Sequence, residues 1–267
     1  MVQTSTSVLM AIAVIVSFLI LLIPFLLFKK DRSLLFKTVT AGAMVFIFAD
    51  LFVRGTIVSL ILGSPDNAVE MMKNQPIVYA LIVSLTTAIV HLLARLLIAS
   101  GIVKNELAKD PRKSAISMGF GQAGLESIYT IGIVYIQHLM LIGKINDGSI
   151  YQMVSATITK DQIDFYITMI QNYQVMPLVL IILKIVMTTL MMIALTLMTV
   201  NAIKQKDKKS YLMIVLVNMS VMFILLYIEL LNVHPLIILA IIIATIVLFG
   251  RYSLQHIQGA RLNDERI

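Results

Sequence analysis

The stretch SVLMAIAVIVSFLILLIPFLLF, residues 7–28, contains no charged residue. A bilayer core about 30 Å thick is crossed by about 20 apolar residues in an α-helix, so this stretch predicts a transmembrane helix. It is too long for the apolar region of a secretory signal peptide, and no small-residue cleavage site follows it. We therefore expect this helix to remain in the mature protein.

The composition of the whole chain agrees with a membrane environment. Of the 267 residues, 59% are hydrophobic and only 13% are charged, whereas soluble domains carry about 25% charged residues. The chain has no cysteine, which excludes disulfides, thiolate metal sites and thiol nucleophiles. A net charge of +7 could suggest nucleic acid, but the placement of the basic residues points to membrane topology instead. We therefore predict membrane lipids, and not nucleic acid, as the surroundings of this protein.

Seven segments are long and apolar enough to span a bilayer. They lie at residues 7–28, 34–62, 76–100, 114–142, 176–203, 210–231 and 235–250. The last is short and could pair with its predecessor across the LNVHP turn. No internal repeat or soluble module is evident. The predicted fold is all-α, a polytopic membrane helix bundle that forms one membrane domain over residues 1–267.

Most of the 21 lysines and arginines follow the first, third, fifth and seventh spans. These residues are Lys29, Lys30, Arg32, Lys37, Lys104, Lys109, Arg112, Lys113, Lys204, Lys206, Lys208, Lys209, Arg251, Arg261 and Arg266. Loops rich in lysine and arginine stay in the cytoplasm. The pattern therefore predicts an outside N-terminus and a cytoplasmic C-terminus, for a multi-pass protein of the bacterial cytoplasmic membrane.

The longest loop, residues 143–175, lies outside the cytoplasm in this topology. Within it, TKDQIDFYITMIQNY (residues 159–173) places Ile163, Tyr166, Ile167 and Ile170 at helical spacing. A capping-box pattern from Thr159 to Gln162 opens this run. We expect an amphipathic helix that lies on the outer leaflet or caps the bundle, and we favour a structured loop helix over a dedicated partner-binding site.

Ionisable residues within a span are costly, so they normally face the bundle interior and find partners there. Asp50 and Arg54 have the i, i+4 spacing of an intrahelical ion pair, and we interpret them as a structural pair. Arg95 is close enough to the cytoplasmic end of its span for its side chain to snorkel to the interface.

Four further polar residues from three spans share one depth. At about 1.5 Å of rise per residue, they lie about 12–18 Å above the cytoplasmic boundary. They are His91, Gln122, Glu126 and Asn218. Together with Arg95 they predict a buried polar layer, which serves either as a network that sets helix register or as a ligand or substrate site. Gly119, Gly121 and Gly124 would let a neighbouring helix approach closely.

Motifs of soluble hydrolases and nucleotide-binding proteins are absent from the sequence: there is no H-E-x-x-H, no G-x-S-x-G in a strand–turn–helix context and no Walker lysine. A zinc site takes three or four His, Cys or carboxylate ligands. At the depth of the polar layer only His91 and Glu126 qualify. The sequence therefore predicts no metal and no other cofactor.

Three stretches resemble the YhfC family of intramembrane peptidases, which is related to the PrsW and CAAX-protease/bacteriocin-processing groups. SLILGSPDNAVEMMKNQPIVYAL (residues 59–81) is similar to the family's outer loop and Pro-initiated third helix. HLLARLLIA (residues 91–99) falls where the family carries E-E-x-x-R, and GFGQAGLESI (residues 119–128) resembles its G-x-G-H-G-x-x-E-x-I. The resemblance implies paired glutamates that activate a water, and histidines that bind metal or stabilise an oxyanion.

This chain departs from that pattern at several of the implied catalytic positions. His91 and Leu92 stand in place of the two glutamates, and Gln122 stands in place of the histidine, while Arg95 and Glu126 are retained. The region where later histidines are expected reads KIVMTTLMMIAL (residues 184–195), and the next span offers Asn218. We expect Gln122 and Glu126 to satisfy one another and His91, as the frame of a lost protease centre.

Three functions remain open from the sequence. The favoured one is a peptidase-like protein without catalysis that binds a membrane peptide or a transmembrane protein, with an immunity or regulatory role by analogy. The second is an active protease that uses Glu126 and His91 as its catalytic residues. The third is a transporter or permease subunit, although no broken-helix or inverted-repeat signal supports it.

Overall fold

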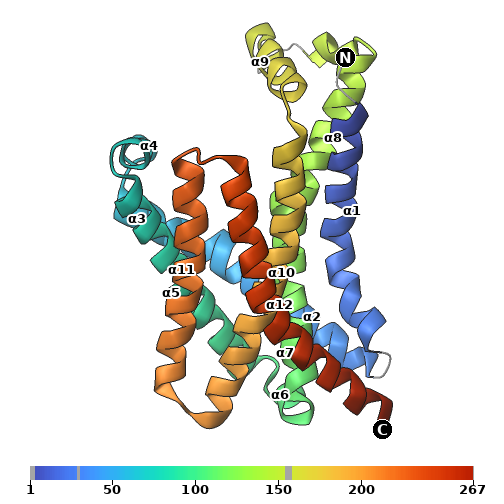
Figure 1. Cartoon of the computed structure of the whole chain (residues 1–267), viewed down its shortest axis with the longest axis vertical. Helices are drawn as coiled ribbons and strands as arrows, with labels where there is room; N and C mark the ends of the chain where they lie inside the picture. The colour runs from blue at the N-terminus through green and yellow to red at the C-terminus, as the bar shows by residue number, and fades with distance from the viewer. Residues whose placement is uncertain (1–3, 29–30, 154–157, 267) are drawn as a thin grey trace. The chain divides into compact units, whose positions relative to one another are not determined.

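A computed structural model describes residues 4–28, 31–153 and 158–266, and side chains are described through residue 258. Over these ranges the chain forms helices and no strand (Figure 1). Seven helices are long and apolar enough to cross a membrane. The predicted all-α polytopic membrane fold with seven spans is confirmed.

The seven spans are built from eleven helical elements. They are α1 (Thr4–Leu27); α2 (Arg32–Phe46) with η1 (Ile47–Arg54) and α3 (Gly55–Leu62); α5 (Pro76–Gly101); α7 (Pro111–Ser127) with η2 (Ile128–Gly132) and α8 (Ile133–Asn146); α10 (Val175–Gln205); α11 (Lys208–Leu230); and α12 (Pro235–Arg266). The connecting elements are α4 (Pro65–Asn74), α6 (Lys104–Lys109), η3 (Ser149–Met153) and α9 (Lys160–Gln171). The seventh helix does not end near residue 250 as predicted, because α12 continues through a polar tail to Arg266.

Proline marks the start of four helices, α4, α5, α7 and α12. Its fixed φ suits the first helical turn, where the missing N–H would have no partner within the helix. At α4 the preceding residue, Ser64, adds an N-cap, since its hydroxyl accepts a hydrogen bond from the Asn67 N–H at 3.3 Å. These local signals explain why the sequence located the helix starts to within a few residues.

The orientation of the helices across the membrane stays a prediction. Of the residues on which it depends, Lys29 and Lys30 lie outside the described residues. The side chains of Arg261 and Arg266 are also outside the described part.

The described residues divide into two compact units. The first contains the residues up to Leu19 together with Ser127–Ile185, and the second contains Ile20–Glu126 together with the residues from Val186 onward. The proposal of one membrane domain over the whole chain stays a prediction. All the polar-layer residues predicted from the sequence fall in the second unit.

The first unit has a core of residues from α1, α8, α9 and α10. Its members are Met10, Ala13, Tyr135, Ile142, Ile170 and Leu178. The helix predicted in the long loop is α9, and its capping box between Thr159 and Gln162 is confirmed. Of the predicted apolar face, Ile163 and Ile170 are buried while Tyr166 is 45% exposed, so α9 packs on its own unit through the two ends of that face.

The α9 capping box supports a first testable prediction. Thr159→Ala removes the hydroxyl that caps the Gln162 N–H, at a cost of about 1 kcal/mol to α9. Amide hydrogen exchange over residues 160–171 should therefore accelerate about fivefold, as local opening becomes easier. Thr168→Ala is the matched control, because the exposed Thr168 hydroxyl bonds only to the Asp164 carbonyl of the same helix. Equal exchange in the two variants would contradict the capping role.

The second unit is organised around α5, which packs against α2, η1 and α11. The close helix approaches predicted at Gly119, Gly121 and Gly124 are confirmed. A Cβ added at Gly121 would meet the Val39 carbonyl oxygen of α2, and one added at Gly119 would lie 2.6 Å from the Ile193 Cα of α10. These glycines bring three helices together around the level of Gln122.

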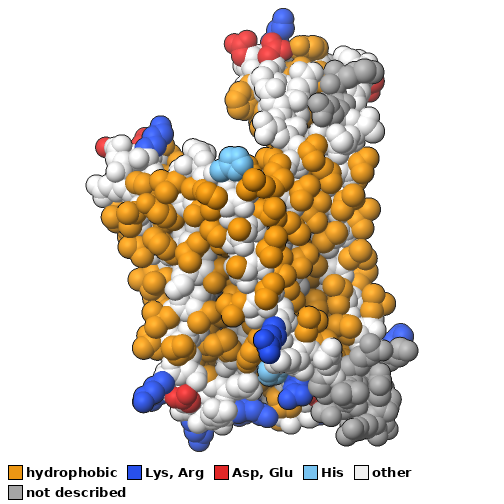
Figure 2. Space-filling view, in the orientation of Figure 1, with side chains coloured by type: hydrophobic (Ala, Val, Ile, Leu, Met, Phe, Trp, Pro, Cys, Tyr) orange, Lys and Arg blue, Asp and Glu red, His pale blue; other side chains and the backbone are white. Residues whose placement is uncertain are grey.

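The surface of the second unit matches a lipid environment. Large hydrophobic side chains are exposed along α11 and α12 (Figure 2), among them Leu212, Met213, Leu236, Val247 and Leu248. One charged pair joins α2 to the connecting helix α6. Lys37 Nζ donates to Glu106 Oε1 at 3.0 Å, and this hydrogen bond holds the pKa of the Glu106 carboxyl below its usual range.

Candidate functional site

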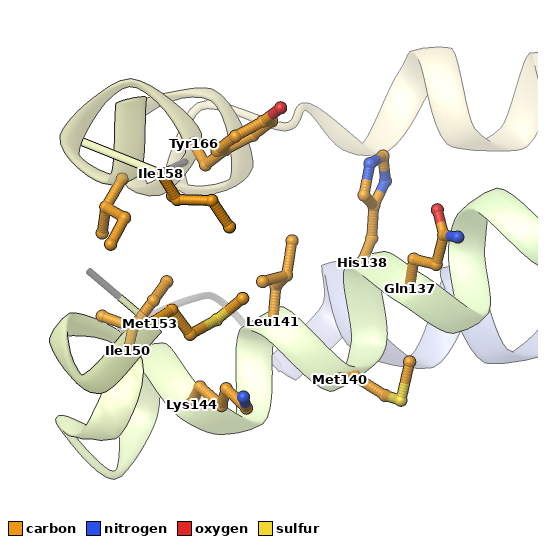
Figure 3. A pocket seen from close by; sticks show the side chains of 10 residues that line it. Gln137, His138, Met140, Leu141, Lys144, Ile150, Met153, Ile158 and Tyr166 are labelled. Atoms are coloured by element: carbon orange, nitrogen blue, oxygen red, sulfur yellow. The ribbon is translucent and has the colours of Figure 1, made fainter. Parts of the chain in front are cut away.

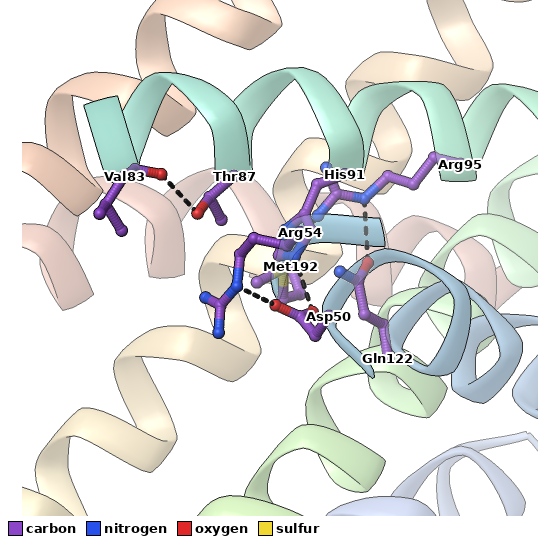
Figure 4. Close-up of polar contacts among 8 residues, drawn as sticks. All are labelled: Asp50, Arg54, Val83, Thr87, His91, Arg95, Gln122 and Met192. Carbon is purple, nitrogen blue, oxygen red and sulfur yellow. Dashed lines mark hydrogen bonds and ion pairs between the residues drawn. The ribbon is translucent and has the colours of Figure 1, made fainter. Parts of the chain in front are cut away.

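The candidate site is centred on α5, where His91 and Arg95 lie one helical turn apart on the same face. His91 is 1% exposed and Arg95 is 0% exposed. The side chains that meet them come from η1, α7 and α10 (Figure 4). We use the name polar centre for the group formed by Asp50, His91, Arg95, Gln122 and Met192.

Asp50 of η1 joins the polar centre through His91. The His91 Nε2 lies 2.8 Å from Asp50 Oδ2. An ionised carboxylate only accepts hydrogen bonds, so Nε2 carries the proton and donates, and Nδ1 of a neutral ring is then the lone-pair nitrogen. The ion pair predicted within this helix is also present, with Arg54 Nε 3.3 Å from Asp50 Oδ1. Asp50 thus has two partners, one in its own helix and one in α5.

The sequence did not place Asp50 in the polar layer. Asp50 lies in η1, an eight-residue π-helical segment, and such segments are rare and often found at functional sites. The wider turn changes which side chains share a face, so α-helical spacing does not apply there. No residue pattern in IFADLFVR marks the change of helix type, and for that reason the contact with His91 was missed.

Arg95 does not snorkel to the interface, so that prediction is wrong. Its Nε donates to Gln122 Oε1 at 3.0 Å and its Nη2 lies 2.9 Å from the Met192 sulfur. It also interacts electrostatically with the carboxylates of Glu126 and Asp50. The guanidinium has polar partners on α7 and η1. The Arg95 side chain is therefore buried inside the bundle and does not extend toward water.

The expected hydrogen bonding of Gln122 and Glu126 with each other and with His91 is also corrected. Gln122 Oε1 accepts from Arg95, and His91 bonds to Asp50. Glu126 is half-buried and interacts with Arg95 through its charge. Arg95 and Asp50 therefore organise this part of the site, because hydrogen bonds to a charged side chain are stronger than hydrogen bonds between neutral groups.

Asn218 lies on α11, the helix that packs along α5. It is fully buried on the same stripe as Ile214 and Leu225. Asn218 is ten residues from the start of α11, and His91 is ten residues from the end of α5. At about 1.5 Å of rise per residue, each side chain lies about 15 Å along its helix from that terminus, and both termini lie toward the lower end of Figure 1. That Asn218 shares the depth of His91 stays a prediction.

Several buried polar atoms of the polar centre and of Asn218 have no hydrogen-bond partner among the described residues. They are His91 Nδ1, Arg95 Nη1, Gln122 Nε2 and both amide atoms of Asn218. Buried polar atoms nearly always have such partners, so each exception calls for an explanation. The set combines donors with acceptors, as the N–H and C=O groups of a peptide backbone do. The polar centre and Asn218 therefore hold unused hydrogen-bond donors and acceptors in the protein interior.

Comparison with protein families identifies the scaffold that carries this site. Residues 12–247 match the family model described as YhfC intramembrane metalloprotease. The chain belongs to the YhfC family. Comparisons with curated proteins and with solved structures gave no match. Together with the seven apolar helices, membership of the YhfC family makes this a multi-pass membrane protein similar to intramembrane peptidases.

The YhfC family description implies a metal ion held by several ligating side chains. The described residues contain no group of three or more His, Cys, Asp or Glu side chains placed to hold one ion. His91 and Asp50 bond to each other, and the Arg95 guanidinium puts a positive charge beside them. A protein zinc site needs three or four such ligands. The side chains of the polar centre do not fit a metal.

Proposed function

We propose that this chain is a peptidase-like membrane protein that has lost metal-dependent hydrolysis and binds a membrane-embedded peptide or the transmembrane segment of another protein. The observation that carries the proposal is the unused hydrogen-bonding capacity of His91, Arg95, Gln122 and Asn218. We place the protein in the bacterial cytoplasmic membrane, where such a binder would serve an immunity or regulatory role.

The loss of hydrolysis is supported by the chemistry of the polar centre. Hydrolysis needs an activated water and stabilisation of the oxyanion that forms. A metal would supply both, but His91 and Asp50 are committed to each other at 2.8 Å and no third ligand joins them within the described ranges. Binding needs only hydrogen bonds and an apolar surface, and the buried amides of Gln122 and Asn218 suit that role.

Binding and cleavage can be measured together in nanodiscs. A set of fluorescently labelled single-span peptides would be titrated against the protein, with mass spectrometry of the same samples to detect cleavage. We expect at least one peptide to bind and none to be cut. Asn218→Leu and Gln122→Leu should each weaken binding about tenfold, the effect of losing a buried hydrogen bond.

Thr199→Val is the matched control for these variants. Thr199 is buried in α10, but its hydroxyl is already bonded to the Leu195 carbonyl at 2.7 Å, so binding should stay within twofold of wild type. Failure of every peptide to bind, or equal weakening in Thr199→Val and Asn218→Leu, would count against the proposal. Peptide cleavage that disappears in His91→Gln would overturn it.

A metal-free hydrolase is the second candidate, and the Asp50–His91 contact favours it. A carboxylate bonded to one imidazole nitrogen orients the ring and leaves the other nitrogen to act as a base. Glu126→Gln separates this candidate from a protease that uses Glu126 and His91. Cleavage that survives Glu126→Gln but is lost in Asp50→Asn would identify the Asp50–His91 pair as the base, whereas loss in Glu126→Gln would identify Glu126.

A further inference from the structure

The first unit contains a cavity of about 420 Å³ between α8, η3 and α9 (Figure 3). It is formed wholly by residues of this unit and is separate from the polar centre described above. Sites for small molecules commonly enclose about 300–1,000 Å³. The volume is therefore sufficient for a small ligand or for part of a chain-like one.

The lining of this cavity is mainly apolar. Leu141 of α8 points into the space below α9, and Met153 of η3 lies on another side (Figure 3). Ile163 of α9 also lines the cavity. Methionine adapts its shape to flexible apolar partners. Because α8 ends the candidate span Pro111–Asn146, Leu141 lies near the end of that span, where we expect hydrocarbon to give way to polar headgroups.

One charged residue, Lys144, lines the cavity among the described residues, and no carboxylate does. Asp147 lies close enough to Lys144 to interact with it electrostatically, but it is exposed and bonds to Ser149. Asp164 of α9 accepts a hydrogen bond from the Tyr151 hydroxyl at 2.7 Å. The cavity thus combines an apolar interior with a positive charge at its edge.

We propose that this cavity binds one acyl chain of an anionic membrane lipid, with Lys144 pairing with the headgroup. The apolar side chains match a hydrocarbon chain, and a juxtamembrane lysine near an anionic headgroup contributes about a fivefold gain in affinity. A peptide fits less well, because its backbone would need many hydrogen-bond partners. Of the few polar lining residues, His138 already contacts the Tyr173 hydroxyl at 3.4 Å.

The packing of α9 explains how the cavity persists. Ile170 is part of the buried core of the unit, and Ile163 is buried at the other half of the helix. The capping box at Thr159 holds the first turn of α9. Between these anchors Tyr166 stays 45% exposed and lines the cavity. The cavity therefore lies beside the middle of α9, between the two ends at which this helix is held.

The natural absence of tryptophan from the chain makes a direct test possible. Tyr166→Trp places a single fluorophore at the cavity. The adjacent Phe165→Trp is the matched control, since Phe165 is 66% exposed on α9 and does not line the cavity. Each variant in detergent would be titrated with lipid carrying a brominated acyl chain, which quenches tryptophan on contact. Thermal unfolding should confirm that both variants fold like wild type.

We expect saturable quenching in Tyr166→Trp, with brominated phosphatidylglycerol half-saturating at about fivefold lower concentration than brominated phosphatidylcholine. Adding Lys144→Gln should abolish this headgroup preference, and adding Leu141→Phe should weaken quenching by filling the cavity. Phe165→Trp should show neither saturation nor preference. Identical titrations at positions 165 and 166 would overturn the proposal, as would a headgroup preference that survives Lys144→Gln.

Discussion

Replacing Arg95 with alanine is expected to lower the free energy of unfolding by about 3–5 kcal/mol, the cost of breaking a buried charge network by removing one member. Arg95 is fully buried, donates to Gln122 and lies beside the Met192 sulfur. It also balances the charges of Asp50 and Glu126. Without the guanidinium these acids lose a positive partner inside an apolar bundle. Reversible unfolding in mixed micelles would measure the loss.

Arg54→Ala is the matched control for Arg95→Ala. The Arg54 side chain is 38% exposed and makes a single ion pair with Asp50 at 3.3 Å, so its removal should cost no more than about 1 kcal/mol. The double variant Arg95→Met with Glu126→Gln should recover part of the loss, because it removes opposite charges together. If Arg95→Ala and Arg54→Ala cost the same, Arg95 is not the organising charge of the polar centre.

Gly121→Ala is expected to destabilise the protein by about 3 kcal/mol or more, which is the upper end of the cost of overpacking. The added methyl group would collide with the Val39 carbonyl oxygen of α2. On the facing helix, a methyl group added at Gly42 would collide with the Met118 carbonyl oxygen of α7. The obstacles are backbone atoms of two long helices, so no side-chain rotation relieves the contact.

The effect of Gly121→Ala should be compared with Gly55→Ala. A Cβ added at Gly55 meets nothing within 4 Å, and alanine is the better helix former by about 0.5–1 kcal/mol. Gly55→Ala should therefore leave the midpoint of thermal unfolding unchanged or raise it, while Gly121→Ala lowers it by several degrees. A Gly121→Ala protein as stable as wild type would show that α2 and α7 do not pack as closely as described.

Much of the fold follows from local features of the sequence. Apolar length predicts the seven spans, and proline marks four helix starts. The capping-box pattern at Thr159 predicts the start of α9. The end of α12 was misjudged because the hydrophobic run stops near residue 250, whereas the helix continues through polar residues. Hydrophobicity predicts which part of a helix crosses lipid, but it does not predict where the helix ends, because a helix can continue into polar sequence.

The site was only partly predictable. The burial of His91, Gln122 and Asn218 follows from the cost of polar groups in lipid, and the glycines around Gln122 predicted close helix approach. The hydrogen-bond partners of these residues could not be predicted from the sequence. Asp50 was assigned to Arg54 alone, and Arg95 was expected at the interface, because spacing within one helix says nothing about which side chain of another helix stands opposite.

By itself, the sequence determined that this is a seven-span membrane protein of the YhfC family whose interior carries a few polar side chains. The spans and the polar interior depend on apolar length and on the free energy of transferring polar groups into hydrocarbon, which act on each segment separately. Family membership follows from the match over residues 12–247. Only the tertiary structure decided that Asp50 bonds to His91 and that Arg95 bonds to Gln122. Asp50 lies in the π-helical segment η1, and Gln122 lies next to the glycine at which α2 and α7 approach closely. Each contact joins segments that are distant in the chain, which local sequence rules do not address.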